Sequence, residues 1–272
     1  MQERLRAALK AIQGVKIPDL PKEIMELDSA LSSKFPNNQA ITDIIESNTK
    51  LSGEVLRIVN SPVMKLKTPV KSIRESVDVL GYVNLRNLVI SAAIKNLFNT
   101  HEVEGIIEHS KDVAFCCAEL SEYIADISRD EAYLLGLFHN GGCLLLATKD
   151  ADKYDKMFSR LNTHPVSGIE KELEVYGASH TDIGILLGQK WKLSVEMLNA
   201  IMLHHIPENN VAKDKVRGMI AMLKVANVIV NEVSYGAYMT EEAREFMAEG
   251  QEELMLEPSV VNQLRRVLIS SS

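Results

Sequence analysis

Residues 132–142 read AYLLGLFHNGG, an apolar helical segment that ends in a histidine, an asparagine and two glycines. His139 continues the helical stripe of Ala132 and Leu135, so its imidazole should point toward the core. A buried polar ring is costly unless it has hydrogen-bonding or ligand partners. The stretch therefore predicts a helix that brings a histidine into an internal polar site.

Three other histidines lie on the apolar faces of predicted helices, His109, His180 and His205, and His204 is next to the last of them. Each of them could be an ordinary core histidine that is satisfied by its own neighbours. Convergence in one pocket would instead partner all of them, and histidine is the commonest transition-metal ligand. We therefore predict that His109, His139, His180 and at least one of His204 and His205 line one pocket in the C-terminal half.

Apolar residues recur at helical spacing along nearly the whole chain, and no alternating strand pattern is present. The segment 72–75 has the form of a capping box that starts a helix, and Gly81 should end that helix. We expect an all-α fold with an N-terminal helical lobe, 1–98, packed on a second helical lobe, 99–272. The segment 99–108 should connect the two lobes. Beyond it we expect helices near 106–126, 130–138, 151–162, 178–191, 194–204 and 213–232, with one or two more after Thr240.

Composition excludes several classes of function. The chain has 272 residues with 30 basic and 37 acidic side chains, a net charge of -7 that does not suit a nucleic-acid-binding protein. No stretch has the roughly 18 uncharged apolar residues of a membrane span, so we expect no membrane partner. Three cysteines, two of them adjacent, form no disulfide framework. We expect a cytoplasmic protein.

Residues 132–142 resemble the helix of the HD phosphohydrolase superfamily, in which a histidine-aspartate pair follows an apolar segment. His109 lies thirty residues earlier, in the sequence His-Ser-x-x-Val-Ala, where that superfamily places its first metal ligand. The resemblance is more specific to the HDOD family, the HD-related output domain, and covers roughly residues 17–230. It rests on Gly177-x-x-His180-x-x-x-Gly184, His204-His205-x-Pro207, Ile17-Pro18-x-Leu20-Pro21, Leu56-Arg57-x-x-Asn60-Ser61 and Val79-Leu80-Gly81.

Two positions depart from a working hydrolase. The resemblance places the aspartate of the HD pair at Asn140 and the later helical aspartate at Asn227, so both should lie at the wall of the pocket. Asparagine is neutral and offers one carbonyl oxygen, so the charges that would offset two dications are missing. Without the metals, little lowers the pKa of an attacking water.

Two interpretations of the pocket stay open at this point. The histidines 109, 139, 180, 204 and 205 could hold one zinc, nickel or iron ion weakly. Alternatively they form a hydrogen-bonded polar core left from an ancestral site, and no cofactor is expected. Glu170, Glu172 and Glu174 could contribute to the pocket, but a solvated acidic helix face explains their pattern better.

The resemblance implies a bacterial signal-transduction module without catalytic residues, which acts as an output or sensor domain by binding a ligand or a protein. Its partners would be signalling proteins, a small ligand or a second copy of the chain in a homodimer. The alternative is a metal-dependent HD-type phosphohydrolase or cyclic-dinucleotide phosphodiesterase. A third interpretation is a nucleotide sensor that keeps the pocket without the chemistry.

Overall fold

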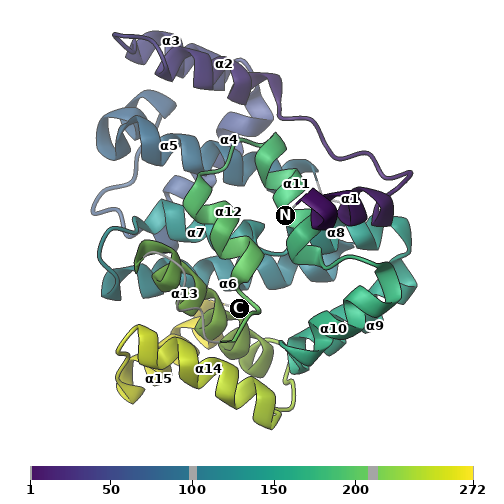
Figure 1. Cartoon of the computed structure of the whole chain (residues 1–272). Helices are drawn as coiled ribbons and strands as arrows, with labels where there is room; N and C mark the ends of the chain where they lie inside the picture. Colours follow the sequence, from purple (N-terminus) through teal and green to yellow (C-terminus); the bar gives the residue numbers. More distant parts are fainter. Residues whose placement is uncertain (1, 98–102, 208–213, 272) are drawn as a thin grey trace.

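The computed structural model describes residues 2–97, 103–207 and 214–271, and these residues form helices and loops without a β-strand (Figure 1). The predicted all-α fold is therefore confirmed. The first helices are α1 (Gln2–Ala11), α2 (Lys22–Leu31), α3 (Asn38–Glu46), α4 (Thr49–Val59), the 3-10 turn η1 (Pro62–Met64) and α5 (Ile73–Leu97). They are followed by α6 (Glu104–Leu120), the 3-10 turn η3 (Ser121–Tyr123), α7 (Arg129–Phe138), α8 (Gly141–Lys149), α9 (Ala151–Thr163) and α10 (Ser167–Tyr176). The last are α11 (His180–Lys190), α12 (Val195–Leu203), α13 (Asp214–Val233), α14 (Glu241–Glu253) and α15 (Pro258–Ser271).

Helix α5 begins where the sequence predicts, and at Gly81, where we expected the helix to end, it has a kink. The backbone nitrogen of Glu75 donates to Ser72 Oγ at 3.1 Å, which is the first half of the capping box. Gly81 has φ 75° and ψ 172° and interrupts the helix with a kink. Such a backbone conformation is open to glycine and strained for other residues. The helix continues after the kink because its next turns are buried against α7 and α4.

The segment Ile73–Lys95 of α5 is the one part of the described chain that is long and apolar enough to cross a membrane. Half of its most apolar stretch is buried inside the protein. The kink at Gly81 lies within this segment.

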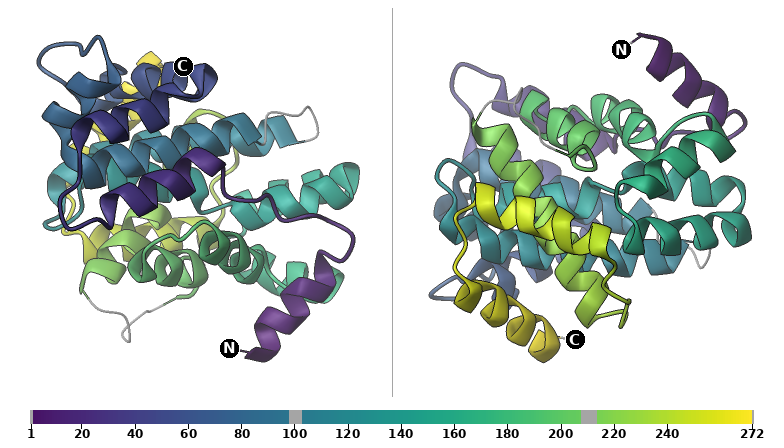
Figure 2. Two further views of the ribbon diagram at one scale, coloured as in Figure 1. Left: turned by 90° about the horizontal axis from the view of Figure 1, so that it is seen from above. Right: turned by 60° about the horizontal axis from the view of Figure 1, so that its bottom comes forward.

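Helix α1 lies against α11, apart from α2 and α3 (Figures 1 and 2). Arg4 forms an ion pair with the buried Asp182 of α11 at 2.8 Å. The connection that follows is held by Trp191 Nε1, which donates to the carbonyl oxygen of Pro18 at 3.1 Å. The division into lobes at residue 98 stays a prediction, and α1 makes its contacts with the second half of the chain.

An ion-pair network joins the two halves beside η1. Lys65 Nζ lies 2.9 Å from Glu119 and 2.7 Å from Glu122. Arg129 also contacts both carboxylates, and its guanidinium donates to the carbonyl oxygen of Val63. Charged groups that share several partners in this way fix the relative position of η1, α6 and α7.

Several predicted boundaries need correction. Residues 98–102 of the expected connection lie outside the described residues, and from Glu104 onward the chain is already helical in α6. The helix expected to run to residue 126 ends at Leu120. Helix α8 was not expected, since it is apolar all round. Helix α10 was expected only as an acidic helix face around Glu172, without bounds, since it alternates charged and apolar residues.

Candidate functional site

Four helices meet where the histidines converge. His109 comes from α6, His139 follows α7, His180 begins α11, and His204 and His205 follow α12. All of them are fully buried except His205, which is partly buried.

Two glycines allow the close helix contacts that this convergence needs. A Cβ at Gly136 of α7 would lie 2.5 Å from Ala114 Cα in α6, and a Cβ at Gly142 of α8 would lie 2.0 Å from the His180 carbonyl oxygen. Because these two glycines have no side chain, α7 can lie close to α6, and α8 can lie close to the start of α11. The second glycine of the HNGG segment is thus part of the site's architecture.

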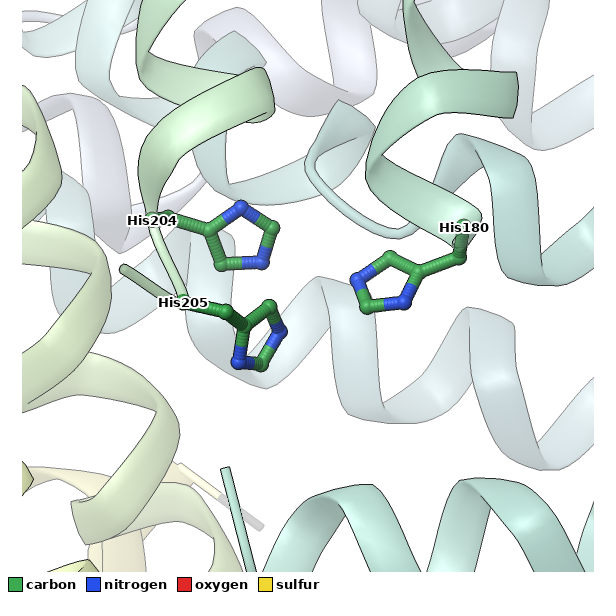
Figure 3. A group of neighbouring side chains, drawn as sticks. All are labelled: His180, His204 and His205. Carbon is green, nitrogen blue, oxygen red and sulfur yellow. The ribbon is translucent and has the colours of Figure 1, made fainter. Parts of the chain in front are cut away.

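Three rings form what we call the trihistidine centre: His180, His204 and His205. One ring nitrogen of each lies within 4.8 Å of those of the other two. Figure 3 shows one nitrogen of each ring directed into the space between the three rings. The ring centroids of His204 and His205 are 4.1 Å apart, and His180 lies 4.9 Å from His205 and 5.5 Å from His204.

The other nitrogen of each ring is anchored to an oxygen that only accepts hydrogen bonds. Nδ1 of His204 donates to the Ile201 carbonyl at 2.8 Å, and Nδ1 of His205 donates to the Pro165 carbonyl at 2.5 Å. Nδ1 of His180 lies 2.9 Å from the Glu172 carboxylate. These partners keep the proton on Nδ1, so in a neutral ring the Nε2 lone pair is free. Nε2 of His180 and of His204 are buried with no protein partner.

Glu172 was expected on a solvated acidic face, and this interpretation is wrong. Its side chain is fully buried, whereas Glu170 and Glu174 are exposed as expected. Its carboxylate accepts from Tyr154 Oη at 2.6 Å, from the backbone nitrogen of His180 at 2.7 Å and from Nδ1 of the same ring. The centre therefore has one negative charge directly behind His180.

Protonation differs within the centre. Burial lowers the pKa of His204 and of His205 well below the usual value, so both rings are neutral near pH 7. Burial also opposes charge on His180, but Cys143 and the Glu172 carboxylate favour it and raise the pKa of His180 well above its usual value. A metal ion bound at Nε2 of His180 would take the place of the proton there. The Glu172 carboxylate would then offset the charge of the ion as it offsets that of the protonated ring.

His109 and His139 form a second group around Asn227. Their Nε2 atoms lie 3.0 and 3.1 Å from Asn227 Oδ1, and Asn227 Nδ2 donates to the Leu223 carbonyl. Nδ1 of His139 lies 2.6 Å from the Gly136 carbonyl and donates to it. Burial lowers the pKa of His109 to about 4 and that of His139 to about 3. Both rings are therefore neutral. Because Nδ1 of His139 carries the proton, its Nε2 has a lone pair, and this lone pair faces Asn227 Oδ1, which is also a hydrogen-bond acceptor.

The two groups adjoin each other. The ring centroids of His139 and His204 are 5.4 Å apart. Asn140, Asn227, His180 and His205 line one cavity of about 10 Å³, with Phe158, Leu161, Asn162, Pro165, Val228, Asn231 and Phe246 completing its wall. A space of this size suits a water or a single ion, whereas small-molecule sites usually have several hundred Å³.

The donor set fits one transition-metal ion. Three neutral imidazole nitrogens are the protein ligands of many zinc sites, and each ligating histidine usually donates its other N–H to a carboxylate or carbonyl. Zinc–nitrogen bonds of about 2.0–2.1 Å would draw the three rings slightly inward. All seven residues predicted at the pocket thus lie in this region, but the five histidines divide into two groups. Sequence reasoning missed the buried roles of Glu172, Tyr154 and Phe246.

Comparison with known proteins identifies the family whose model matches this chain. Residues 17–207 match the model of the HDOD domain. An HDOD domain protein from Geobacter sulfurreducens has a solved structure with a TM-score of 0.70 at 19% identity, covering 98% of this chain and 97% of that one. A candidate metal-dependent phosphohydrolase from Shewanella amazonensis has a TM-score of 0.67 at 17% identity, with 99% and 98% covered. A candidate signal transduction protein from Marinobacter aquaeolei has a TM-score of 0.70 at 20% identity, with 99% and 62% covered.

The curated relatives are longer proteins. An uncharacterized protein from Treponema pallidum is 22% identical over 220 residues, which are 79% of this chain and 42% of that protein. The uncharacterized protein YuxH from Bacillus subtilis is 29% identical over 72 residues, 26% of this chain and 18% of that protein. The chain therefore spans less than half the length of the curated relatives that it matches.

Proposed function

The chain belongs to the HDOD domain family, and from this premise we propose that it is a non-catalytic signal-transduction module of the bacterial cytoplasm. We propose further that one transition-metal ion, held by His180, His204 and His205, is the ligand to which the module responds. The solved relative from Marinobacter is named for signal transduction, which is in keeping with this role.

One observation carries the proposal: two buried Nε2 atoms, of His180 and His204, have no protein partner. A buried polar atom without a partner costs roughly 1–3 kcal/mol. A bound ion would give both atoms a partner and so remove that cost, and it would also bind Nε2 of His205. The Nδ1 anchors already hold the rings in the tautomer that an ion requires.

The same residues argue against hydrolysis. Two-metal phosphoryl transfer needs carboxylates that bridge and neutralise a pair of dications. The positions where the superfamily has them are Asn140 and Asn227, and Oδ1 of Asn227 already accepts from His109. Glu172 contacts His180 and lies behind the ring. The single negative charge of Glu172 offsets the positive charge of one bound ion better than that of two.

The alternative is a metal-dependent phosphohydrolase, as the Shewanella relative is named. The acceptor–acceptor contact between His139 Nε2 and Asn227 Oδ1 is the feature that favours it, because a second cation there would relieve the contact. Such an enzyme would also need room for a phosphate ester beside both groups, and the cavity has about 10 Å³.

The response would reach a partner through the packing of the helices. His180 begins α11, and α11 carries α1 on its outer side. We propose that occupancy of the centre shifts this packing and changes the affinity for a signalling protein or for a second copy of the chain. Nucleic acid and membranes are not among the partners we propose.

Elemental analysis paired with a hydrolysis assay tests the proposed function. Protein purified without chelators is loaded with zinc, manganese or iron, and its metal content is measured. The same samples are assayed with bis(p-nitrophenyl) phosphate, cyclic dinucleotides and nucleoside phosphates. We expect at most one ion per chain and no hydrolysis above buffer. Metal-dependent hydrolysis that is abolished by His139→Ala would establish the enzyme instead.

A further inference from the structure

Helix α14 covers the trihistidine centre on the side of His205. The ring of Phe246 stacks on that of His205, with centroids 5.9 Å apart and an angle of 20° between the planes. Phe246 is 2% exposed and lines the cavity beside Asn140 and His180. The right-hand view of Figure 2 shows α14 and α15 together on one side of the molecule. The aromatic ring therefore separates the centre from that side of the protein.

The start of α14 is held by hydrogen bonds to the turn before α10. The Glu242 carboxylate accepts from the backbone nitrogens of Val166 and Ser167 at 2.7 and 3.0 Å, and from Ser167 Oγ at 2.7 Å. This turn also contains Pro165, whose carbonyl anchors Nδ1 of His205. The attachment of α14 and the orientation of a ring of the centre thus depend on the same turn.

The middle of α14 is held by charge. Lys224 of α13, only 4% exposed, pairs with Glu249 and places its ammonium 5.0 Å from the Phe246 ring centroid. The apolar contacts of α14 with α13 come from one row of buried residues, Ala243, Phe246, Met247 and Gly250. Six of its 13 residues are glutamate. A helix that packs through a single apolar row and is fixed at its start by polar contacts opens more easily than the core beneath it.

We propose that α14 is a movable cover of the trihistidine centre, and that release of its Glu242 and Lys224 contacts opens the centre to solvent. The cover lies after residues 17–207, which match the family model. This proposal rests on the proposed function only for the identity of the ion that enters the trihistidine centre. The covering contacts themselves are independent of any ion.

Chemical labelling of the histidines tests the cover without a metal. Diethyl pyrocarbonate modifies accessible neutral imidazoles, and mass spectrometry gives the rate at His205. Phe246→Ala removes the covering ring, and Glu242→Ala loosens α14 without emptying the core. We expect both variants to raise the labelling rate at His205 by about tenfold or more.

Matched controls separate opening from general damage. Phe35→Ala removes a phenylalanine that is 80% exposed, and Glu241→Ala removes an exposed carboxylate from the same turn of α14. Both should label as the wild type does. If Phe246→Ala does not fold, Glu242→Ala alone decides the test. Wild-type rates at His205 in every folded variant would overturn the proposal.

A second measurement distinguishes failure of the cover from failure of the proposed function. Zinc-loaded protein is mixed with the chelator 4-(2-pyridylazo)resorcinol, and the rate of zinc release is followed. We expect faster release from Glu242→Ala than from Glu241→Ala. Zinc that binds but leaves every variant at one rate would contradict the cover and leave the metal site standing. Faster labelling in protein that binds no zinc would support the cover and contradict the proposed ion.

Discussion

Glu172 sets the charge of the trihistidine centre. A dication among neutral imidazoles keeps its full charge in a medium of low dielectric, which is costly. The carboxylate behind His180 offsets part of this charge and orients the ring through its hydrogen bond. Tyr154, itself fully buried, fixes the carboxylate from the other side. The ion-binding strength of the centre should therefore depend on a residue that does not touch the ion.

Replacement of Glu172 by glutamine tests this dependence. Glu172→Gln keeps the size of the side chain and removes its charge, so zinc affinity should fall by about 10- to 100-fold. Glu174→Gln is the matched control, because Glu174 lies on the same helix and is exposed. Competition with a chromogenic chelator measures both affinities. Equal zinc affinity in the two variants would show that the buried carboxylate has no part in the centre.

The burial of Glu172 also marks the limit of what the sequence predicts at this scale. The inward direction of His109, His139 and His180 follows from the apolar residues that share their helical faces. The same spacing places His205 inward, whereas its neighbour His204 is the more deeply buried of the two. The segment EKELEV around Glu172 alternates acidic and other residues, which is equally typical of a solvated face. Burial there depends on where α10 lies relative to α9 and α11, and local spacing contains no information about it.

At the level of elements, close helix contacts at glycine position the site. The approach of α8 to the start of α11 leaves no room for a Cβ at Gly142. The sequence predicts neither this contact nor α8 itself. An apolar stretch without a polar face gives no helical period to recognise.

Alanine substitutions at two glycines should have opposite effects on stability. Gly142→Ala forces α8 and α11 apart and should lower the free energy of unfolding by about 1–3 kcal/mol. Gly53 is exposed within α4, and nothing lies within 4 Å of the position that an added methyl group would take. Gly53→Ala should therefore raise the free energy of unfolding by about 0.5–1 kcal/mol. Urea unfolding followed by circular dichroism measures both. A Gly142→Ala protein as stable as the wild type would mean that the two helices do not pack as closely as described.

The attachment of α14 should make stability depend on pH. Burial opposes ionisation of Glu242, but donors from Ser167 and Val166 outweigh it and lower its pKa from 4.5. A carboxyl with a lowered folded pKa stabilises the protein above its unfolded pKa and loses that effect as pH falls through the folded value. The wild type should therefore be more stable than Glu242→Gln at about pH 7, and the difference should shrink at about pH 3.5.

Urea unfolding at a series of pH values measures this convergence. Glu241→Gln is the control, since its exposed side chain should give a difference from the wild type that is small and constant. A Glu242→Gln difference that stays unchanged on acidification would contradict the capping role of this carboxylate.

At the scale of the whole molecule, the sequence predicts the class of fold and the family better than the arrangement of the parts. Helical spacing predicts an all-α protein, and the motifs around His109, His139 and His180 resemble the family that the comparison then shows. The placement of α1 on α11 and of α14 over the centre is set by long-range packing. Neither α1 nor α14 lies within residues 17–207, which match the family model.

The division of the histidines into two groups decides what the molecule can do. Hydrolysis by two metals requires two ions side by side, each with its own ligands. The observed arrangement gives His109 and His139 a common neutral partner in Asn227, and leaves Nε2 of His180 and of His204 in the trihistidine centre without a protein partner. The central claim is therefore one ion, held by one of the two groups.

Native mass spectrometry of the zinc-loaded chain tests this claim most directly, because it counts the ions bound to each intact molecule. We expect one zinc ion per chain, lost in His204→Ala and retained in His109→Ala. Two zinc ions per chain, or one ion that is lost in His109→Ala and retained in His204→Ala, would contradict it.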